Sequence, residues 1–211
     1  MINVSILHNV NAVSYDKAND HRSDKLYIKL SNQNSPRLTH RHVRKMFDMA
    51  LTYHVYAGNF KTTELSLTIT DSQVSKNQID PDELHQAALK SMQKLFPAKV
   101  DFMENFVPGN PLEIPTLVIT NTQQFCGASS ILYPGVLRKA SRMLKGNIYV
   151  VPVSTEEVLA FNDQNKDPNL LLRLKRLLTT SNAHFRSSDP LLVLSNNVYH
   201  YDADKDMLMP V

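Results

Sequence analysis

The sequence predicts an α+β fold in which mixed sheets of paired strands pack with four helices. Some segments alternate apolar and polar residues, as strands do when one face of a sheet is buried. Other segments repeat apolar residues at helical spacing, and the strand segments occur in pairs between single helices. No internal repeat is visible along the 211 residues.

The first sixty residues are predicted to contain two strands and one helix. The strands lie at residues 2–6 and 26–30, because apolar residues alternate with polar ones there, and a long polar loop or mobile arm, residues 9–24, separates them. The helix runs from residue 35 to about residue 56, since apolar residues recur on one helical face. Gly58 stands where a helix needs its C-terminal cap.

A strand at residues 64–70 and a helix at residues 80–96 follow. The start of that helix is well marked, because Asp80 can cap it, Pro81 suits the first turn and Glu83 occupies the capping-box position. Three prolines and a glycine fall within residues 103–115, so this stretch is predicted to connect two α+β lobes, residues 1–105 and 106–211, unless the chain forms one continuous domain.

The second half alternates short strands with two helices. The helices start at Pro134, ending before Gly146, and at Asp167-Pro168. The predicted strands are residues 115–120, 127–132, 147–153, 158–161, 191–194 and 198–201, the last turning at residues 202–206 into residues 207–209.

Composition limits the class of protein. Hydrophobic residues make up 42% of the chain and charged residues 20%, with a net charge of +3, which is typical of a globular protein and excludes collagen, coiled-coil and disordered chains. The single cysteine, Cys126, excludes an intrachain disulfide framework and a CxxC zinc site. No apolar run is long enough to span a membrane, and no signal peptide is visible, so we expect a cytoplasmic protein.

Basic residues fall in three predicted helices and form candidate binding groups. Binding to a phosphate backbone would require them to converge on one surface, whereas the plainer interpretation is three solvated helix faces. The groups are Arg37, Arg41, Arg44 and Lys45; Arg138, Lys139, Arg142 and Lys145; and Arg173, Lys175 and Arg176.

The sequence contains no recognisable catalytic motif, and its candidate catalytic residues are few. Cys126 is the only candidate thiol nucleophile, and an inert, partly buried thiol is the better interpretation. Glu156 and Glu157 could hold a cation, but adjacent residues of a strand point to opposite faces. The histidines His40, His42, His54 and His85 and the acidic turn at residues 202–206 lack the spacing of a metal site. We therefore assign no catalytic residue, metal or cofactor.

Five segments of the chain carry recognisable motifs, namely residues 80–97, 119–121, 127–137 (GASSILYPGVL), 151–158 and 194–202. Together they resemble a family of uncharacterised bacterial proteins grouped as a domain of unknown function. The resemblance covers about two thirds of the chain, and the first sixty residues match poorly. Where the family has Ser-x-His-Glu, this chain has Ser154-Thr155-Glu156-Glu157.

The family resemblance implies the fold and a bacterial or phage source, since such proteins are common in Gram-positive gut bacteria and in mobile genome regions, but it implies no reaction. Our first hypothesis is a protein that binds another protein stoichiometrically, as a regulator of a mobile element or an inhibitor of a bacterial defence nuclease. The alternatives are a nucleic-acid-binding protein that uses the basic helices, and a hydrolase that uses Cys126. Asn121 and Tyr133 could line a groove at the carboxyl ends of strands.

Overall fold

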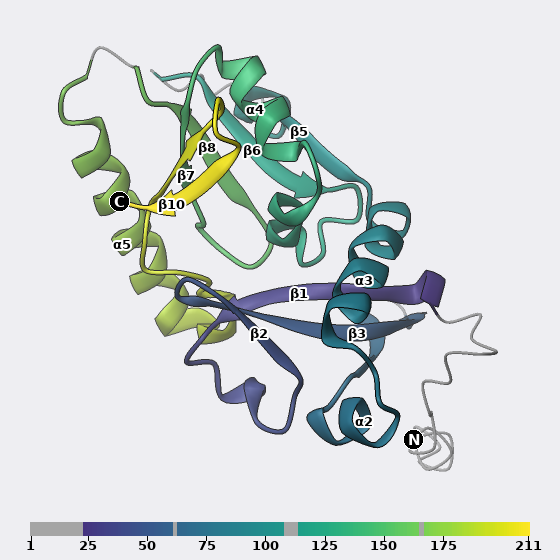
Figure 1. Ribbon diagram of the computed structural model, residues 1–211. Coiled ribbons are helices and arrows are strands. Elements are labelled where there is room, and N and C mark those ends of the chain that lie inside the picture. The colour runs from purple at the N-terminus through teal and green to yellow at the C-terminus, as the bar shows by residue number, and fades with distance from the viewer. Residues whose placement is uncertain (1–22, 61–62, 108–113, 165–166) are drawn as a thin grey trace.

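The computed structural model describes residues 23–60, 63–107, 114–164 and 167–211, and it contains two antiparallel sheets (Figure 1). The first sheet pairs β1 with one side of β3, and both β2 and β4 with the other side. The second sheet has six strands in the order β10-β9-β7-β8-β6-β5. The predicted α+β class is confirmed.

The bounds of the elements are as follows. The strands are β1 (Leu26–Asn32), β2 (Val43–Met46), β3 (Met49–Phe60), β4 (Thr63–Thr68), β5 (Ala98–Phe102), β6 (Thr116–Asn121), β7 (Ile148–Val151), β8 (Val158–Asn162), β9 (Tyr199–Asp202) and β10 (Met207–Pro210). The α-helices are α2 (Asp71–Lys76), α3 (Pro81–Leu95), α4 (Val136–Leu144) and α5 (Leu170–Ser188). The short 3-10 helices are η2 (Ser23–Lys25), η3 (Pro36–Leu38), η4 (Met103–Asn105), η5 (Gly127–Leu132) and η6 (Pro190–Leu192).

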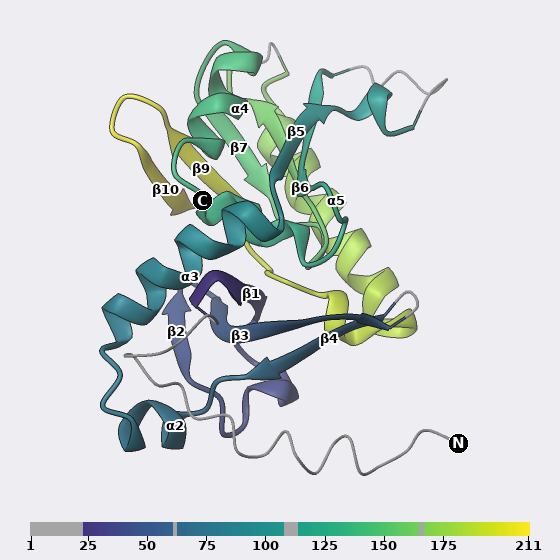
Figure 2. The ribbon, with the colours of Figure 1, turned by 90° about the vertical axis from the view of Figure 1, so that its right-hand side faces the viewer.

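The two faces of the first sheet differ in polarity because its strands alternate. Ile28 pairs with Tyr53 on the face that α3 covers, where the hydroxyl of Tyr53 hydrogen-bonds Nδ1 of His85 at 3.0 Å. Helix α3 runs across the front of β1 and β3 in Figure 1 and lies above β3 in Figure 2. Lys29 pairs with Thr52 on the opposite face, which is polar.

The second sheet is covered on both faces. Alternate residues of its central strands divide between two apolar clusters: Leu117 and Ile119 pack with α4, whereas Val118 packs with α5. Helices α4 and α5 therefore lie on opposite sides of this sheet. None of the helices in the described part is both long and apolar enough to span a membrane.

The two sheets share one apolar cluster, which contains residues of both. Polar contacts join them as well. The backbone N–H of Leu30 donates to Oγ of Ser129 at 3.1 Å. The carboxylate of Asp48 accepts from Ser195 Oγ at 2.7 Å and from the hydroxyl of Tyr199. The proposed division at residue 105 stays a prediction.

The predicted helix over residues 35–56 is wrong. Only η3 is helical there, and most of the remainder forms β2 and β3. The chain turns between these strands at Phe47, which adopts a left-handed φ of 57°. Gly58, with φ of 120°, lies at a bulge in β3 rather than at a helix end. The apolar residues of this segment fit helical spacing, but pairing with β1 decides the structure.

Two predicted strands are also wrong, because residues 127–132 form η5 and residues 190–192 form η6. Sequence patterns missed β5 and α2. The other elements predicted between residues 26 and 209 are confirmed within a few residues, including the hairpin of β9 and β10. The strand predicted at residues 2–6, and the loop predicted after it as far as residue 22, lie outside the described residues.

Candidate functional site

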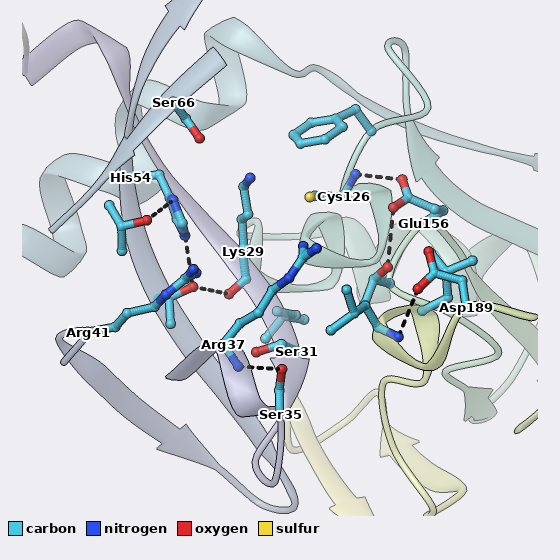
Figure 3. A pocket seen from close by; sticks show the side chains of 17 residues that line it. Lys29, Ser31, Ser35, Arg37, Arg41, His54, Ser66, Cys126, Glu156 and Asp189 are labelled. Atoms are coloured by element: carbon cyan, nitrogen blue, oxygen red, sulfur yellow. Dashed lines mark hydrogen bonds between the residues drawn. The ribbon is translucent and has the colours of Figure 1, made fainter. Parts of the chain in front are cut away.

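A pocket of about 420 Å³ opens between the polar face of the first sheet and loops of the second sheet (Figure 3). Its floor comes from alternate positions of three strands, so all of these side chains lie on one face of the sheet. The floor consists of Lys29 and Ser31 of β1, Thr52 and His54 of β3, and Ser66 and Thr68 of β4. The walls include Arg37, Arg41, Phe125, Cys126, Glu156 and Asp189.

Three cationic side chains face this pocket, namely Lys29, Arg37 and Arg41. Burial lowers the pKa of Lys29, and the positive charges of Arg41 and Arg37 lower it further, while Cys126 and Glu156 act in the opposite direction. Burial, followed by repulsion from Arg37, lowers the pKa of Arg41. Within the described part of the chain, neither arginine forms an ion pair with a carboxylate.

Local sequence explains how the arginines reach the pocket. Ser35 caps η3, since its Oγ accepts from the backbone N–H of Arg37 at 3.4 Å, and Pro36 suits the first turn. Arg41 pairs with Thr70 as an isolated antiparallel bridge beside the sheet. In Figure 3 the side chains of Arg37 and Arg41 project from this segment toward Lys29.

The two carboxylates of the pocket wall also hold its loops. Glu156 accepts from the backbone N–H of Cys126 at 2.7 Å and from Oγ1 of Thr155 at 3.2 Å. Burial raises the pKa of Glu156, although these hydrogen bonds and Lys29 act against that rise. Asp189 accepts from the backbone N–H of Leu191 at 3.1 Å, which caps η6.

His54 is fixed by two threonines in the pocket floor. Its Nε2 lies 2.9 Å from Oγ1 of Thr52, and its Nδ1 lies 3.2 Å from Oγ1 of Thr68. Burial, with a smaller effect of Lys29 and Arg41, lowers the pKa of His54 well below its usual value, so the imidazole is neutral at pH 7. Because both ring nitrogens are engaged, His54 is poorly placed to act as a base for the Cys126 thiol.

The loop that carries Cys126 has an unusual backbone. Cys126 adopts a left-handed φ of 47°, and Gly127 packs so closely that an added Cβ would lie 2.0 Å from Oγ1 of Thr120. Asn121 organises this loop: its Nδ2 donates to the carbonyl of Phe125 at 2.7 Å, and its Oδ1 accepts from the N–H of Gln123 at 3.0 Å.

Of the candidate binding residues named from sequence, only Arg37 and Arg41 line the pocket; Cys126, Glu156 and His54, which the sequence offered for catalysis or metal binding, line it as well. Arg44 lies on the opposite face of the first sheet and pairs with Asp82 at 2.8 Å, and Lys45 is exposed on β2. Asn121 is buried and supports the Cys126 loop.

Tyr133 is also buried, and its hydroxyl donates to the carbonyls of Met92 and Phe96 at 3.3 and 2.9 Å. Neither Asn121 nor Tyr133 lines the pocket.

The basic residues named from sequence on α4 and α5 do not line this pocket, and the two helices cover opposite faces of the second sheet. Arg138 of α4 pairs with Asp206 at 3.1 Å. Arg173 of α5 pairs with Asp167 at 2.9 Å. Arg142 and Arg176 are exposed on their helices. The three basic groups therefore lie on different surfaces.

Sequence reasoning missed Lys29 and Ser66, and it considered His54 only as a metal ligand. The available signal was the alternation of polar residues in β1, β3 and β4, which places their side chains on one face. No group of three or more His, Cys, Asp or Glu side chains that could hold a metal ion occurs in the described ranges.

The fold and the pocket define a two-sheet α+β protein with a polar, cation-lined cavity between its sheets. The chain belongs to a family of unknown function, DUF5688, whose family model matches residues 7–203. The expectation that the first sixty residues lie outside the resemblance is therefore wrong. No curated protein and no solved structure matches the chain.

Proposed function

We propose that this protein acts by stoichiometric binding and that its pocket receives an anionic group of the partner. The observation that carries the proposal is the convergence of Lys29, Arg37 and Arg41 on one half-enclosed cavity, where neither arginine is paired with a carboxylate of the described residues. Burial and mutual repulsion make the charged forms of Lys29 and Arg41 less favourable. An anion bound between these cations would offset that cost, because it forms charge-assisted hydrogen bonds with them.

The partner in this proposal is a protein, and the site of action is the bacterial cytoplasm. A single cysteine in 211 residues suits a reducing compartment. The sequence resemblance adds the hypothesis that the protein regulates a mobile element or inhibits a defence nuclease.

The nucleic-acid alternative is less well supported, because the basic groups of α4 and α5 lie on opposite sides of the second sheet. A hydrolase that uses Cys126 is a second alternative, since the thiol lines the pocket and lies close enough to Lys29 to affect its pKa. The engagement of both ring nitrogens of His54 favours binding over this chemistry.

Thermal unfolding in the presence of polyvalent anions tests the proposal. Inorganic phosphate and citrate, compared with sodium chloride at equal ionic strength, should raise the Tm of the native protein by roughly 3–6 °C at ten times their Kd. The double variant Arg37→Met/Arg41→Met should lose this rise.

Arg44→Met, which removes an arginine of the same segment on the other face of the sheet, is the matched control and should keep the rise. An equal rise in all three proteins, or none in any of them, would contradict the proposal.

A further inference from the structure

A second cavity adjoins the pocket and lies between the segment that carries η3 and the segments that carry α5 and η6. It measures about 320 Å³, and Ser35 and Leu191 line both cavities. Residues of η3 and η6 line both cavities, which are referred to together as the groove, with Lys29 in the first cavity and Arg186 of α5 in the second. A small anion would fill only the first part of this groove.

The second cavity differs from the first in its chemistry. Its cation is Arg186, whose guanidinium donates to Oδ1 of Asn196 at 2.8 Å and is thereby oriented. The amide of Asn34 offers a donor and an acceptor, and the Nδ2 of Asn196 offers a further donor, which suit a peptide backbone. Pro36 and Pro190 add exposed apolar surface at the rim.

We infer that the groove binds an extended acidic peptide segment of a protein partner, with one acidic side chain between Lys29, Arg37 and Arg41 and a second at Arg186. The inference rests on the proposed function and specifies the ligand class of the same site. An extended peptide advances about 3.3 Å per residue, so a few neutral residues would separate its two acidic positions.

Two observations favour a peptide over a single-stranded nucleic acid. Among the residues that line the second cavity no aromatic side chain is available to stack on a base. Asp189 and Glu156 lie on the wall of the first cavity. A nucleic acid carries a charge at every nucleotide and would be repelled there, whereas a peptide can place neutral residues opposite these carboxylates.

Two readouts on the full-length protein test the inference. The first is the rate at which iodoacetamide alkylates Cys126, the only cysteine of the chain, because a ligand in the first cavity should shield it. The second is the fluorescence anisotropy of labelled peptides in which a Glu-Glu pair is followed, after two to six Gly or Ser residues, by one further Glu or by Gln.

We expect phosphate and the peptides to slow alkylation, and we expect the best-spaced Glu peptide to bind roughly twofold to fivefold more tightly than its Gln counterpart. Arg186→Met should abolish that difference while leaving protection by phosphate intact. Arg176→Met, an exposed arginine of the same helix that lines neither cavity, is the matched control and should leave both readouts unchanged.

The other outcomes separate the two proposals. Protection by phosphate without any gain from the further Glu would overturn the peptide inference and leave the anion pocket standing. Absence of protection by both phosphate and peptides would overturn both. Tighter binding of the oligonucleotide dT12 than of every peptide, weakened by Arg186→Met, would overturn the peptide in favour of nucleic acid.

Discussion

Gly127→Ala should be the most disruptive small substitution near the pocket. An alanine Cβ would lie 2.0 Å from Oγ1 of Thr120 and 2.3 Å from the carbonyl oxygen of Glu156. Those two oxygens are joined by a hydrogen bond of 2.8 Å, so the methyl group would be inserted into that bond. Strand β6 and the loop that carries Glu156 would have to separate.

Two costs add up in this variant. Overpacking of a well-packed site costs about 1–3 kcal/mol. Loss of a hydrogen bond that leaves buried oxygens unsatisfied costs about 1–3 kcal/mol more. We therefore expect Gly127→Ala to lower the free energy of unfolding by about 2–6 kcal/mol, measured by urea denaturation with the slope m compared between proteins.

Gly135→Ala is the matched control. Gly135 has a positive φ of 80°, but no atom lies within 4 Å of its added Cβ, so only the left-handed backbone is penalised, by about 1–2 kcal/mol. The double variant Gly127→Ala/Thr120→Ala should lose less stability than the sum of the single variants, because the nearest clashing atom is gone. A loss for Gly127→Ala no larger than that for Gly135→Ala would refute the reasoning.

Three further substitutions have expected outcomes. Burial lowers the pKa of His54, so its imidazole is neutral in the folded protein. Below pH 6.5 the unfolded chain therefore binds more protons than the folded chain. The free energy of unfolding should fall as the pH decreases from 6.5, by up to about 1.4 kcal/mol per pH unit. His54→Gln should flatten this dependence in urea titrations, and identical slopes in both proteins would count against a neutral His54. Asp48→Asn should cost about 2 kcal/mol, since the carboxylate accepts hydrogen bonds that join the two sheets; an unchanged urea midpoint would show that these contacts do not stabilise the fold. Tyr133→Phe should lower the free energy of unfolding, measured by calorimetry, by about 1 kcal/mol and should leave the anion-dependent rise in Tm unchanged. Loss of that rise would show that Tyr133 contributes to anion binding.

The parts of the fold that local signals determine could be predicted from the sequence. Helix α3 begins where Asp80 accepts hydrogen bonds from the backbone N–H groups of Asp82 and Glu83. Because this cap involves only neighbouring residues, the sequence alone predicts the start of the helix. For residues 35–56 the local sequence pattern predicted the wrong structure. Their apolar spacing fits a helix, but the long-range pairing of β3 with β1 prevails.

The candidate site could be predicted only in part, for a similar reason. Arg37 and Arg41 were named as basic residues, yet their partners in the pocket come from distant segments. Cys126 and Glu156 reach Lys29 only because η5 and the loop before β8 pack beside β1. The polar alternation in β1 indicates a solvated sheet face, but nothing local shows what lies opposite that face.

The charge state of Lys29 tests the central claim most directly. The pKa of Lys29 is lowered by burial and by the neighbouring arginines, and an anion bound among these cations must raise it, because it stabilises the protonated amine. The measurement is the NMR titration of the ¹³Cε resonance of Lys29, assigned with Lys29→Arg, without and with citrate. We predict a pKa below the usual value of a lysine in the free protein and an upward shift with citrate. A Lys29 that titrates as an ordinary lysine, at the same pH in both samples, would contradict the anion pocket.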